Sequence, residues 1–320
     1  MKWYDWVLLI CVVMPLGVWV LSWFIGPFFA YHATLHRTSK KKWARGVDNA
    51  FEGTDTELFI KGTAWHEAHA KYQRDVHIVR DGLNLYGEFY DLGTDRCVMV
   101  LPGRREGLCG SYYYAIPYAR KGLSVLVIDP RAHGDSDGEF NTVGFEEHKD
   151  AMAWLRFLQQ ECGVRSVVLH GICIGCASGI YALTSDECPD IVEGIVTDGM
   201  FTNFFHSMYH RMRAYKIPSM PGLDILLLNC WMRFYTGHSM RVGPIDYIDR
   251  LRHPILMLHS KEDRYSTPDQ AEKLFQKAGS PQKKLVWFEK GAHSQLRFTD
   301  TERYDNAIEQ FLESLETAKV

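Results

Sequence analysis

A cysteine occupies a glycine-flanked turn in the stretch HGICIGCASG, where Cys173 lies between Gly171 and Gly175. The run SVVLH before it has the apolar, β-rich character of a buried strand, and the run ASGIYAL after it is typical of a helix. A nucleophile at such a junction projects from the end of a sheet, and the start of the helix favours a thiolate over a thiol. The sequence therefore predicts that Cys173 is a nucleophile.

Two later residues provide the groups that a nucleophilic cysteine needs. Asp263 follows the apolar run PILMLHS, and His293 follows KLVWFE, so each is expected just past the end of a strand. His293 would accept the thiol proton and return it to the leaving group, while Asp263 would orient the imidazole and stabilise its charged form. Asp198, which ends the run IVEGIVTD, is an alternative for the acid.

An acyl-transfer site also needs two N–H groups that stabilise the oxyanion. The backbone amide of Ile174, directly after the nucleophile, is expected to provide the first. The loop LPGRREG, which follows CVMVL, is expected to provide the second from Arg104, with Arg105 in reserve. We expect neither a cofactor nor a metal ion at this site.

The elements that must position these residues alternate in type. Short β-rich apolar runs are separated by helical patterns at 145–160 and 300–315, which predicts an α/β fold with a mostly parallel central sheet and crossover helices. Asp81-Gly82, between VHIV and LNLYGEFY, predicts a β-hairpin. The segment 201–240 interrupts the alternation and is predicted to be an inserted cap. The predicted strands are residues 97–101, 124–129, 166–170, 191–198, 254–260 and 284–289.

The N-terminal segment has the composition of a single membrane span. Residues 6–31 contain no Asp, Glu, Lys, Arg or His, and as a helix they would be about 39 Å long, against a hydrocarbon core of about 30 Å. Aromatic residues at both ends suit the two membrane interfaces. A cleaved signal peptide and a buried helix of a soluble protein are the alternatives. The predicted organisation is a transmembrane anchor at 1–34, a juxtamembrane linker at 35–74 and a domain at 75–320.

Charge and cysteine content bear on the compartment. Five basic residues follow the span and only Lys2 precedes it, which favours a membrane protein whose catalytic domain is cytoplasmic. The eight cysteines lack a dense framework of regular spacings, which is compatible with a reducing compartment. The net charge of -3 shows no basic excess, so nucleic acid is not an expected partner. The five basic residues are Arg37, Lys40, Lys41, Lys42 and Arg45.

From about Asp75 to its end, the chain resembles the alpha/beta-hydrolase superfamily. It is most similar to membrane-anchored bacterial esterase/lipase-like members and to the serine aminopeptidase S33-type domain. The resemblance rests on the GICIG turn, on the order nucleophile, acid, histidine, and on DPRAHGDSDG, which is similar to a D-x-R-x-H-G-x-S-x-G segment of these proteins. It implies hydrolysis of an ester, thioester or amide through a covalent acyl-enzyme.

The chain departs from most such proteins in having cysteine where they have serine, and it resembles dienelactone hydrolase in this respect. A thiol exchanges acyl groups readily with thioesters and activated esters, whereas amide cleavage demands more of the histidine as an acid. We therefore predict a membrane-anchored hydrolase of small-molecule or lipid-like acyl esters or thioesters. The alternatives are a catalytically inactive scaffold, a peptidase, and a redox protein that uses Cys173-x-x-Cys176.

Overall fold

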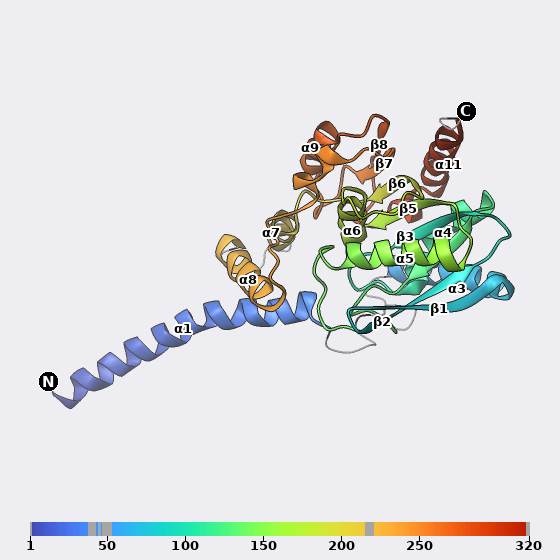
Figure 1. Ribbon diagram of the computed structural model, residues 1–320. Helices are drawn as coiled ribbons and strands as arrows, with labels where there is room; N and C mark the ends of the chain where they lie inside the picture. The colour runs from blue at the N-terminus through green and yellow to red at the C-terminus, as the bar shows by residue number, and fades with distance from the viewer. Residues whose placement is uncertain (1, 38–42, 44–45, 47–52, 215–220, 318–320) are drawn as a thin grey trace.

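The computed structural model describes residues 2–37, 43, 46, 53–214 and 221–317. Its centre is an eight-stranded sheet with the order β1-β2-β4-β3-β5-β6-β7-β8 (Figure 1). The strands from β3 to β8 are parallel to one another, and β2 pairs with β4 in the antiparallel sense. The strands are β1 Gln73–Arg80, β2 Leu83–Tyr90, β3 Arg96–Leu101, β4 Ser124–Ile128, β5 Ser166–Ile172, β6 Val192–Asp198, β7 Ile255–Ser260 and β8 Lys283–Phe288.

The predicted hairpin and the six predicted parallel strands are confirmed. Strands β1 and β2 are joined by Asp81 and Gly82, whose φ angles of 52° and 76° are both positive, as a two-residue type I′ turn requires. Strands β3 to β8 coincide with the predicted runs to within two residues at each end. Because β3, β4, β5 and β7 are covered on both faces, their sequences are largely continuous apolar runs and do not alternate with polar residues.

Helices cover both faces of the sheet. Helices α3, α4 and α11 pack on one face, where Leu58, Tyr118 and Ile308 belong to one core, and α5, α6 and α9 pack on the other. The predicted helices at 145–160 and 300–315 are confirmed as α5 and α11. The helices are α3 Gly53–His69, α4 Leu108–Arg120, α5 Glu147–Glu161, α6 Ile174–Leu183, α9 Pro268–Lys277, α10 Leu296–Thr299 and α11 Thr301–Thr317, with short 3-10 turns at Ala70–Tyr72, Pro244–Asp246 and Ile248–Arg250.

Helix α1, Trp3–Leu35, projects from the rest of the molecule (Figure 1). Its 33 residues correspond to about 50 Å of helix. Of the described residues, only this helix is long and apolar enough to cross a membrane, and its most apolar 18-residue window has none of its residues buried. Its last turn docks on the domain, since the Leu35 carbonyl accepts the backbone N–H of Asn141 at 2.8 Å, and just beyond the helix Arg37 donates to the Glu139 carbonyl at 2.7 Å. Lys40, Lys41, Lys42 and Arg45 lie outside the described residues.

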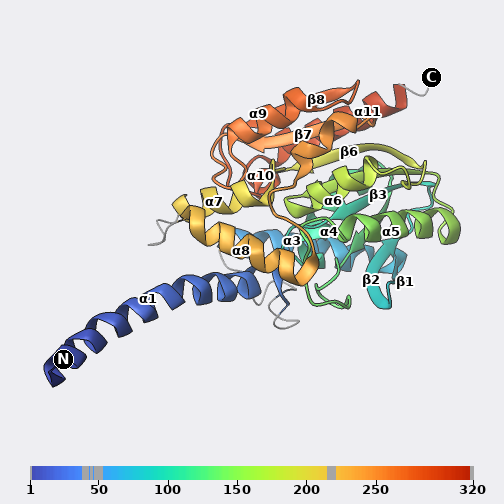
Figure 2. The same ribbon diagram turned by 60° about the vertical axis from the view of Figure 1, so that its left-hand side comes forward.

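Two helices occupy the segment predicted to be a cap. They are α7, Phe204–Ala214, and α8, Pro221–Thr236, and α8 lies along the C-terminal half of α1 (Figure 2). In the segment predicted as a juxtamembrane linker, helix α3 packs against α4. The domain boundaries drawn from the sequence stay predictions.

Candidate functional site

Cys173 occupies a sharp turn between strand β5 and helix α6. Its φ of 52° and ψ of -110° lie outside the regions that a non-glycine residue ordinarily adopts, a strain worth about 1–3 kcal/mol that persists only when the surroundings enforce it. A Cβ on Gly171 would lie 2.7 Å from the backbone N of Cys176, and a Cβ on Gly175 would overlap the carbonyl oxygen of Leu101. The two glycines therefore allow the close approach of backbones that exposes the sulfur.

Hydrogen bonds fix this turn to the neighbouring strand. The backbone N–H of Cys173 donates to the carbonyl of Asp198, at the end of β6, at 2.9 Å. Ile174 is the first residue of α6, so its N–H belongs to the first turn, where the helix itself offers no acceptor. This is the position expected for one oxyanion donor.

Asp263 and His293 meet at the carboxyl ends of β7 and β8. Nδ1 of His293 donates to Oδ2 of Asp263 at 2.7 Å. The other carboxylate oxygen, Oδ1, accepts the backbone N–H groups of Tyr265 at 2.8 Å and Ser266 at 2.9 Å. These three bonds leave the carboxylate one orientation, and they leave Nε2 of His293 to face another group.

The Cys173 sulfur lies close to the His293 ring: it is among the groups that raise the pKa of that imidazole, and both side chains line one cavity. The structure therefore brings together the three residues that the sequence proposes as nucleophile, base and acid, although 120 positions separate Cys173 from His293. Tyr114 helps to hold the histidine loop, since its hydroxyl donates to the Ser294 carbonyl at 2.5 Å. Sequence reasoning did not find Tyr114, because nothing local in α4 indicates a contact 180 positions away.

The pKa shifts of His293 and Asp263 favour the charged form of each residue. Burial lowers the pKa of His293, but the Asp263 carboxylate and the Cys173 sulfur outweigh burial and raise it well above its usual value. Burial raises the pKa of Asp263, but the charge and hydrogen bond of His293, with the Tyr265 and Ser266 amides, lower it overall. Both shifts favour an ion pair between the His293 imidazolium and the Asp263 carboxylate.

Asp198, the alternative acid, has a different environment. Its Oδ2 accepts the Tyr304 hydroxyl at 2.9 Å, and Tyr304 also contacts Nε2 of buried His170 at 3.2 Å. Burial raises the pKa of Asp198 to about 7, against the lowering effects of Tyr304 and His293. The geometry thus favours Asp263 over Asp198 as the partner of His293.

The loop after β3 is held by a histidine from the DPRAHGDSDG segment. The Arg105 backbone N–H donates to Nε2 of His133 at 3.1 Å, and Nδ1 of His133 donates to the Arg131 carbonyl at 2.9 Å. Burial lowers the pKa of His133 to about 4, so the ring is neutral and has one donor and one acceptor. With the Arg105 amide engaged, the geometry disfavours Arg105 as the second oxyanion donor, and Arg104 stays our prediction.

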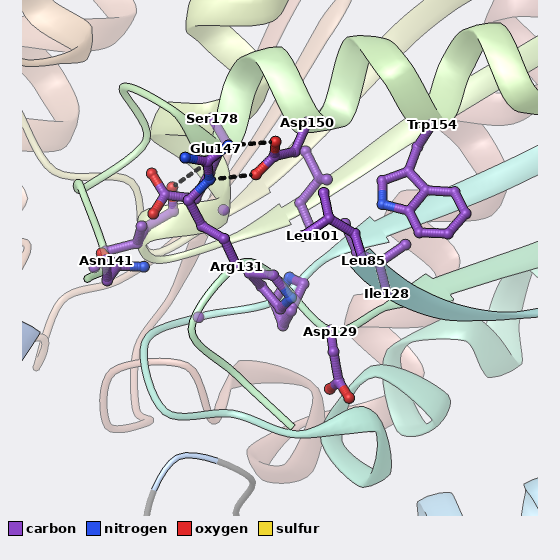
Figure 3. Close-up of a pocket in the computed structure, with 15 residues that line it drawn as sticks. Leu85, Leu101, Ile128, Asp129, Arg131, Asn141, Glu147, Asp150, Trp154 and Ser178 are labelled. Carbon is purple, nitrogen blue, oxygen red and sulfur yellow. Dashed lines mark hydrogen bonds and ion pairs between the residues drawn. The ribbon is translucent and has the colours of Figure 1, made fainter. Parts of the chain in front are cut away.

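A small cavity lies behind this loop and the start of α6 (Figure 3). Its volume of about 20 Å³ is room for roughly one water molecule. Arg131 points toward Asp150 there, and its Nε and Nη2 donate to the two carboxylate oxygens at 2.6 and 2.7 Å. This bidentate ion pair ties the DPRAHGDSDG segment to α5.

A larger cavity, of about 430 Å³, opens at Cys173 and His293. This volume lies within the range of roughly 300–1,000 Å³ that is usual for small-molecule sites. Apolar and polar side chains from several elements line it, including Phe59 of α3 and Phe204 of α7. Among the described residues, no group of three or more His, Cys, Asp or Glu side chains is arranged to hold a metal ion.

Cys176 is fully buried one turn into α6. Its thiol donates to the carbonyls of Gly171 at 3.1 Å and Asp198 at 3.4 Å, and burial raises its pKa well above the usual value. A buried, poorly ionised thiol is a weak partner for disulfide exchange. Both Cys173 and Cys176 are free thiols in the structure.

Comparison with known proteins places this geometry in context. The family model described as "Serine aminopeptidase, S33" matches residues 245–300, which include Asp263 and His293. The uncharacterized protein YqkD of Bacillus subtilis is 28% identical over 226 residues, which are 69% of this chain and 72% of that protein. The uncharacterized membrane protein YNL320W of Saccharomyces cerevisiae is 21% identical over 276 residues, 84% of this chain and 86% of that protein.

Solved structures share the architecture. An esterase of Pyrococcus furiosus, Pf2001, aligns with a TM-score of 0.66 at 19% identity over 78% of this chain and 93% of its own. The mouse alpha/beta hydrolase domain-containing protein 10 aligns with a TM-score of 0.56 at 15% identity over 76% of this chain and 99% of its own. The chain has the alpha/beta-hydrolase fold. Pyrococcus horikoshii acylaminoacyl peptidase also shares this fold, with a TM-score of 0.55 at 18% identity over 76% of this chain and 41% of its own.

The residues of the candidate site lie in three turns at the carboxyl edge of the sheet, after β5, β7 and β8. In this chain those three turns carry Cys173, Asp263 and His293.

Proposed function

We propose that this protein is a membrane-anchored hydrolase that cleaves acyl esters or thioesters with a Cys-His-Asp triad. One observation carries the proposal: a cysteine in a strained, positive-φ turn shares a cavity with a histidine whose Nδ1 is held 2.7 Å from a buried carboxylate. Perturbed ionisable groups gathered at a cavity are typical of catalytic sites. The esterase among the structural neighbours is compatible with this chemistry and shares only the fold.

Acylation would begin with attack of the Cys173 sulfur on the acyl carbonyl carbon. His293 takes the thiol proton, and the carbonyl π electrons move to the oxygen, where the amides of Ile174 and Arg104 stabilise the oxyanion. Collapse of this intermediate breaks the bond to the leaving oxygen or sulfur, which receives the proton from His293. The product is an acyl thioester on Cys173 and a free alcohol or thiol.

Deacylation would repeat these steps with water. His293 takes a proton from water as the oxygen attacks the thioester carbonyl, and the second tetrahedral intermediate expels the Cys173 sulfur. The sulfur regains its proton from the imidazolium, and the carboxylic acid leaves. Asp263 stays ionised throughout and keeps Nε2 directed at the reacting atoms.

Membrane anchoring through α1 is part of the proposal. The helix is longer than a bilayer core of about 30 Å, and its most apolar window is exposed, as a lipid-facing segment would be. The basic residues after the span favour a cytoplasmic domain. Protease protection of the domain in sealed vesicles tests this orientation, and cleavage from the opposite side would overturn it.

The decisive experiment compares wild type with two variants on p-nitrophenyl acyl esters and matched thioesters. We expect Cys173→Ala to reduce turnover to the uncatalysed rate. We expect Cys173→Ser to retain a small fraction, because a hydroxyl gives up its proton less readily than a thiol. Equal rates for all three proteins would end the catalytic proposal and favour an interaction or scaffold role for the fold.

A further inference from the structure

Two cavities meet beside the candidate nucleophile. The inner one, of about 430 Å³, contains Cys173 and His293, and the outer one, of about 630 Å³, lies between α1 and the cap helices α7 and α8. Four residues line both cavities, so the two adjoin, and the boundary that these residues form is called the passage. The shared residues are Arg104, Arg105, Met208 and Arg211.

Helix α1 forms one wall of the outer cavity through residues between Trp19 and Thr34. The helix is about 50 Å long and a hydrocarbon core is about 30 Å thick, so about 20 Å of the helix extends beyond the core. If residues from Trp6 onward fill the core, so that the charged Asp5 stays outside it, the part beyond the core begins near Gly26. The outer cavity therefore lies at the membrane surface, where a lipid can enter it directly from the bilayer.

Contacts on the domain hold this end of α1 in place. The Tyr31 ring stacks on Tyr235 of α8 at 5.4 Å, and the Phe28 ring contacts Trp231 of α8 at 5.0 Å. The backbone N–H of Asn141 donates to the Leu35 carbonyl at 2.8 Å. These contacts make α1 a fixed wall of the cavity, and Figure 2 shows α8 running along it.

The passage between the cavities is positively charged. Three of its four shared residues are arginines, whereas the lining carboxylates lie to either side, Glu106 in the inner cavity and Asp224 in the outer one. Nη1 of Arg104 donates to the Thr34 carbonyl at 3.2 Å, so this arginine joins the loop after β3 to the end of α1. Arg211 lies over the Tyr265 ring at 5.5 Å.

Charge distribution limits what can occupy the path. An apolar chain threaded past three guanidinium groups would surround them with apolar atoms and offer no compensating charge. A phosphate or carboxylate at the same place would accept several charge-assisted hydrogen bonds. A molecule that moves from the membrane towards Cys173 would therefore meet the outer cavity first, then the anion site at the arginines, and then the nucleophile.

We infer that the substrate is an anionic lipid that carries the scissile acyl ester or thioester on its headgroup. Its tail lies in the outer cavity against α1, its anionic group lies at Arg104, Arg105 and Arg211, and its acyl carbonyl lies at Cys173. Hydrolysis adds water across the acyl bond, releasing a small carboxylic acid and leaving the deacylated lipid in the membrane. This inference rests on the proposed hydrolase function and names its substrate class.

The test uses the full chain in phosphatidylcholine vesicles and three butyrate esters. The first is dipalmitoylphosphatidylglycerol with butyrate on its terminal hydroxyl, the second is its neutral phosphate methyl triester, and the third is butyryl glycerophosphoglycerol, which lacks tails. Released butyrate gives kcat/KM for each. We expect the anionic lipid to exceed each of the other two roughly tenfold or more, since each lacks one set of contacts.

Matched variants separate the contribution of the arginines from that of the outer cavity. Arg211→Gln should remove most of the preference for the anionic lipid over the triester, whereas Arg213→Gln should keep it, although Arg213 also lies over a tyrosine ring, at 5.8 Å. Gly26→Phe should reduce the preference for the tailed lipid over the tailless ester, because Gly26 lines the outer cavity. Gly17→Phe should keep it, since Gly17 lies on the opposite side of α1.

Both glycine positions accept a side chain, since a Cβ at either meets nothing within 4 Å. Ala30→Phe, which also lines the outer cavity, repeats the Gly26 test at a second position. Cys173-dependent hydrolysis of p-nitrophenyl butyrate with no preference among the three lipid esters overturns the inference and leaves the hydrolase. A preference for long acyl chains, with no anion effect, also overturns it. Absence of any Cys173-dependent turnover removes the proposed function and the inference together.

Discussion

Substitution of Asp263 by asparagine tests the triad because the structure dictates how the new amide must lie. In the wild type, Oδ1 accepts two backbone N–H groups, from Tyr265 and Ser266, while Oδ2 accepts the His293 Nδ1 proton. An NH₂ group cannot face two N–H donors, so the asparagine oxygen takes the Oδ1 place. Its NH₂ then points at His293 and forces Nδ1 to become an acceptor.

The consequence for catalysis is a change of tautomer. With Nδ1 as acceptor, the proton of a neutral His293 lies on Nε2, which then has no lone pair for the Cys173 proton. In the Ser-His-Asp proteases the corresponding change lowers kcat about 10⁴-fold. A thiol ionises more easily than a serine hydroxyl, so we expect a loss of roughly 10²- to 10⁴-fold here, or about 2.7 to 5.4 kcal/mol in the barrier.

The assay is single-turnover release of p-nitrophenol from p-nitrophenyl butyrate between pH 5 and pH 9. Removing the Asp263 charge removes the main cause that raises the pKa of His293, so the limb of the pH–rate profile that reports His293 as the base should shift to lower pH. Asp198→Asn is the control, with an expected loss of at most a few-fold. If Asp198→Asn costs as much as Asp263→Asn, the assignment of the acid is refuted.

Three further variants follow from the surrounding contacts. His133→Ala removes the acceptor of the Arg105 amide and loosens the loop after β3, so kcat should fall about tenfold. The rate at which iodoacetamide alkylates Cys173 should stay unchanged. An equal fall in both rates would point to general unfolding. The pKa of Asp198 is raised by burial from 3.8 to about 7, so its ionisation destabilises the fold increasingly as pH rises from about 4 through 7, by up to about 4 kcal/mol. Asp198→Asn should therefore raise the Tm relative to wild type more at pH 8 than at pH 4.5, and an identical difference at both pH values would contradict this. Cys176→Ser should leave the rate within about threefold of wild type, because the thiol only donates to backbone carbonyls; a loss as large as that of Cys173→Ala would revive a two-cysteine mechanism.

The strands and the hairpin could be predicted because their signals are local. The apolar runs report burial on both faces of the sheet, and Asp81-Gly82 reports a turn that needs two positive φ angles. The neighbourhood of Cys173, Asp263 and His293 also follows from local patterns, because the carboxyl ends of parallel strands share one edge. Each of these predictions needs only the type and order of the elements.

Contacts that depend on side-chain packing between distant segments could not be predicted. The hydrogen bond from the Arg105 amide to His133 joins two loops, and the segments carry no shared pattern that would reveal it. The docking of α1 on α8 was missed for another reason: an apolar helix looks the same in a sequence whether lipid or protein covers it. The passage of arginines between the two cavities arises from that docking.

The covalent intermediate tests the central claim most directly. Wild-type protein is mixed with excess S-phenyl thiobutyrate, quenched in acid within the first turnover, digested and analysed by mass spectrometry. We predict a butyryl group on Cys173, formed much more slowly in His293→Ala and absent in Cys173→Ala. Turnover with no acyl group on Cys173, or with the acyl group on another of the eight cysteines, would contradict the account.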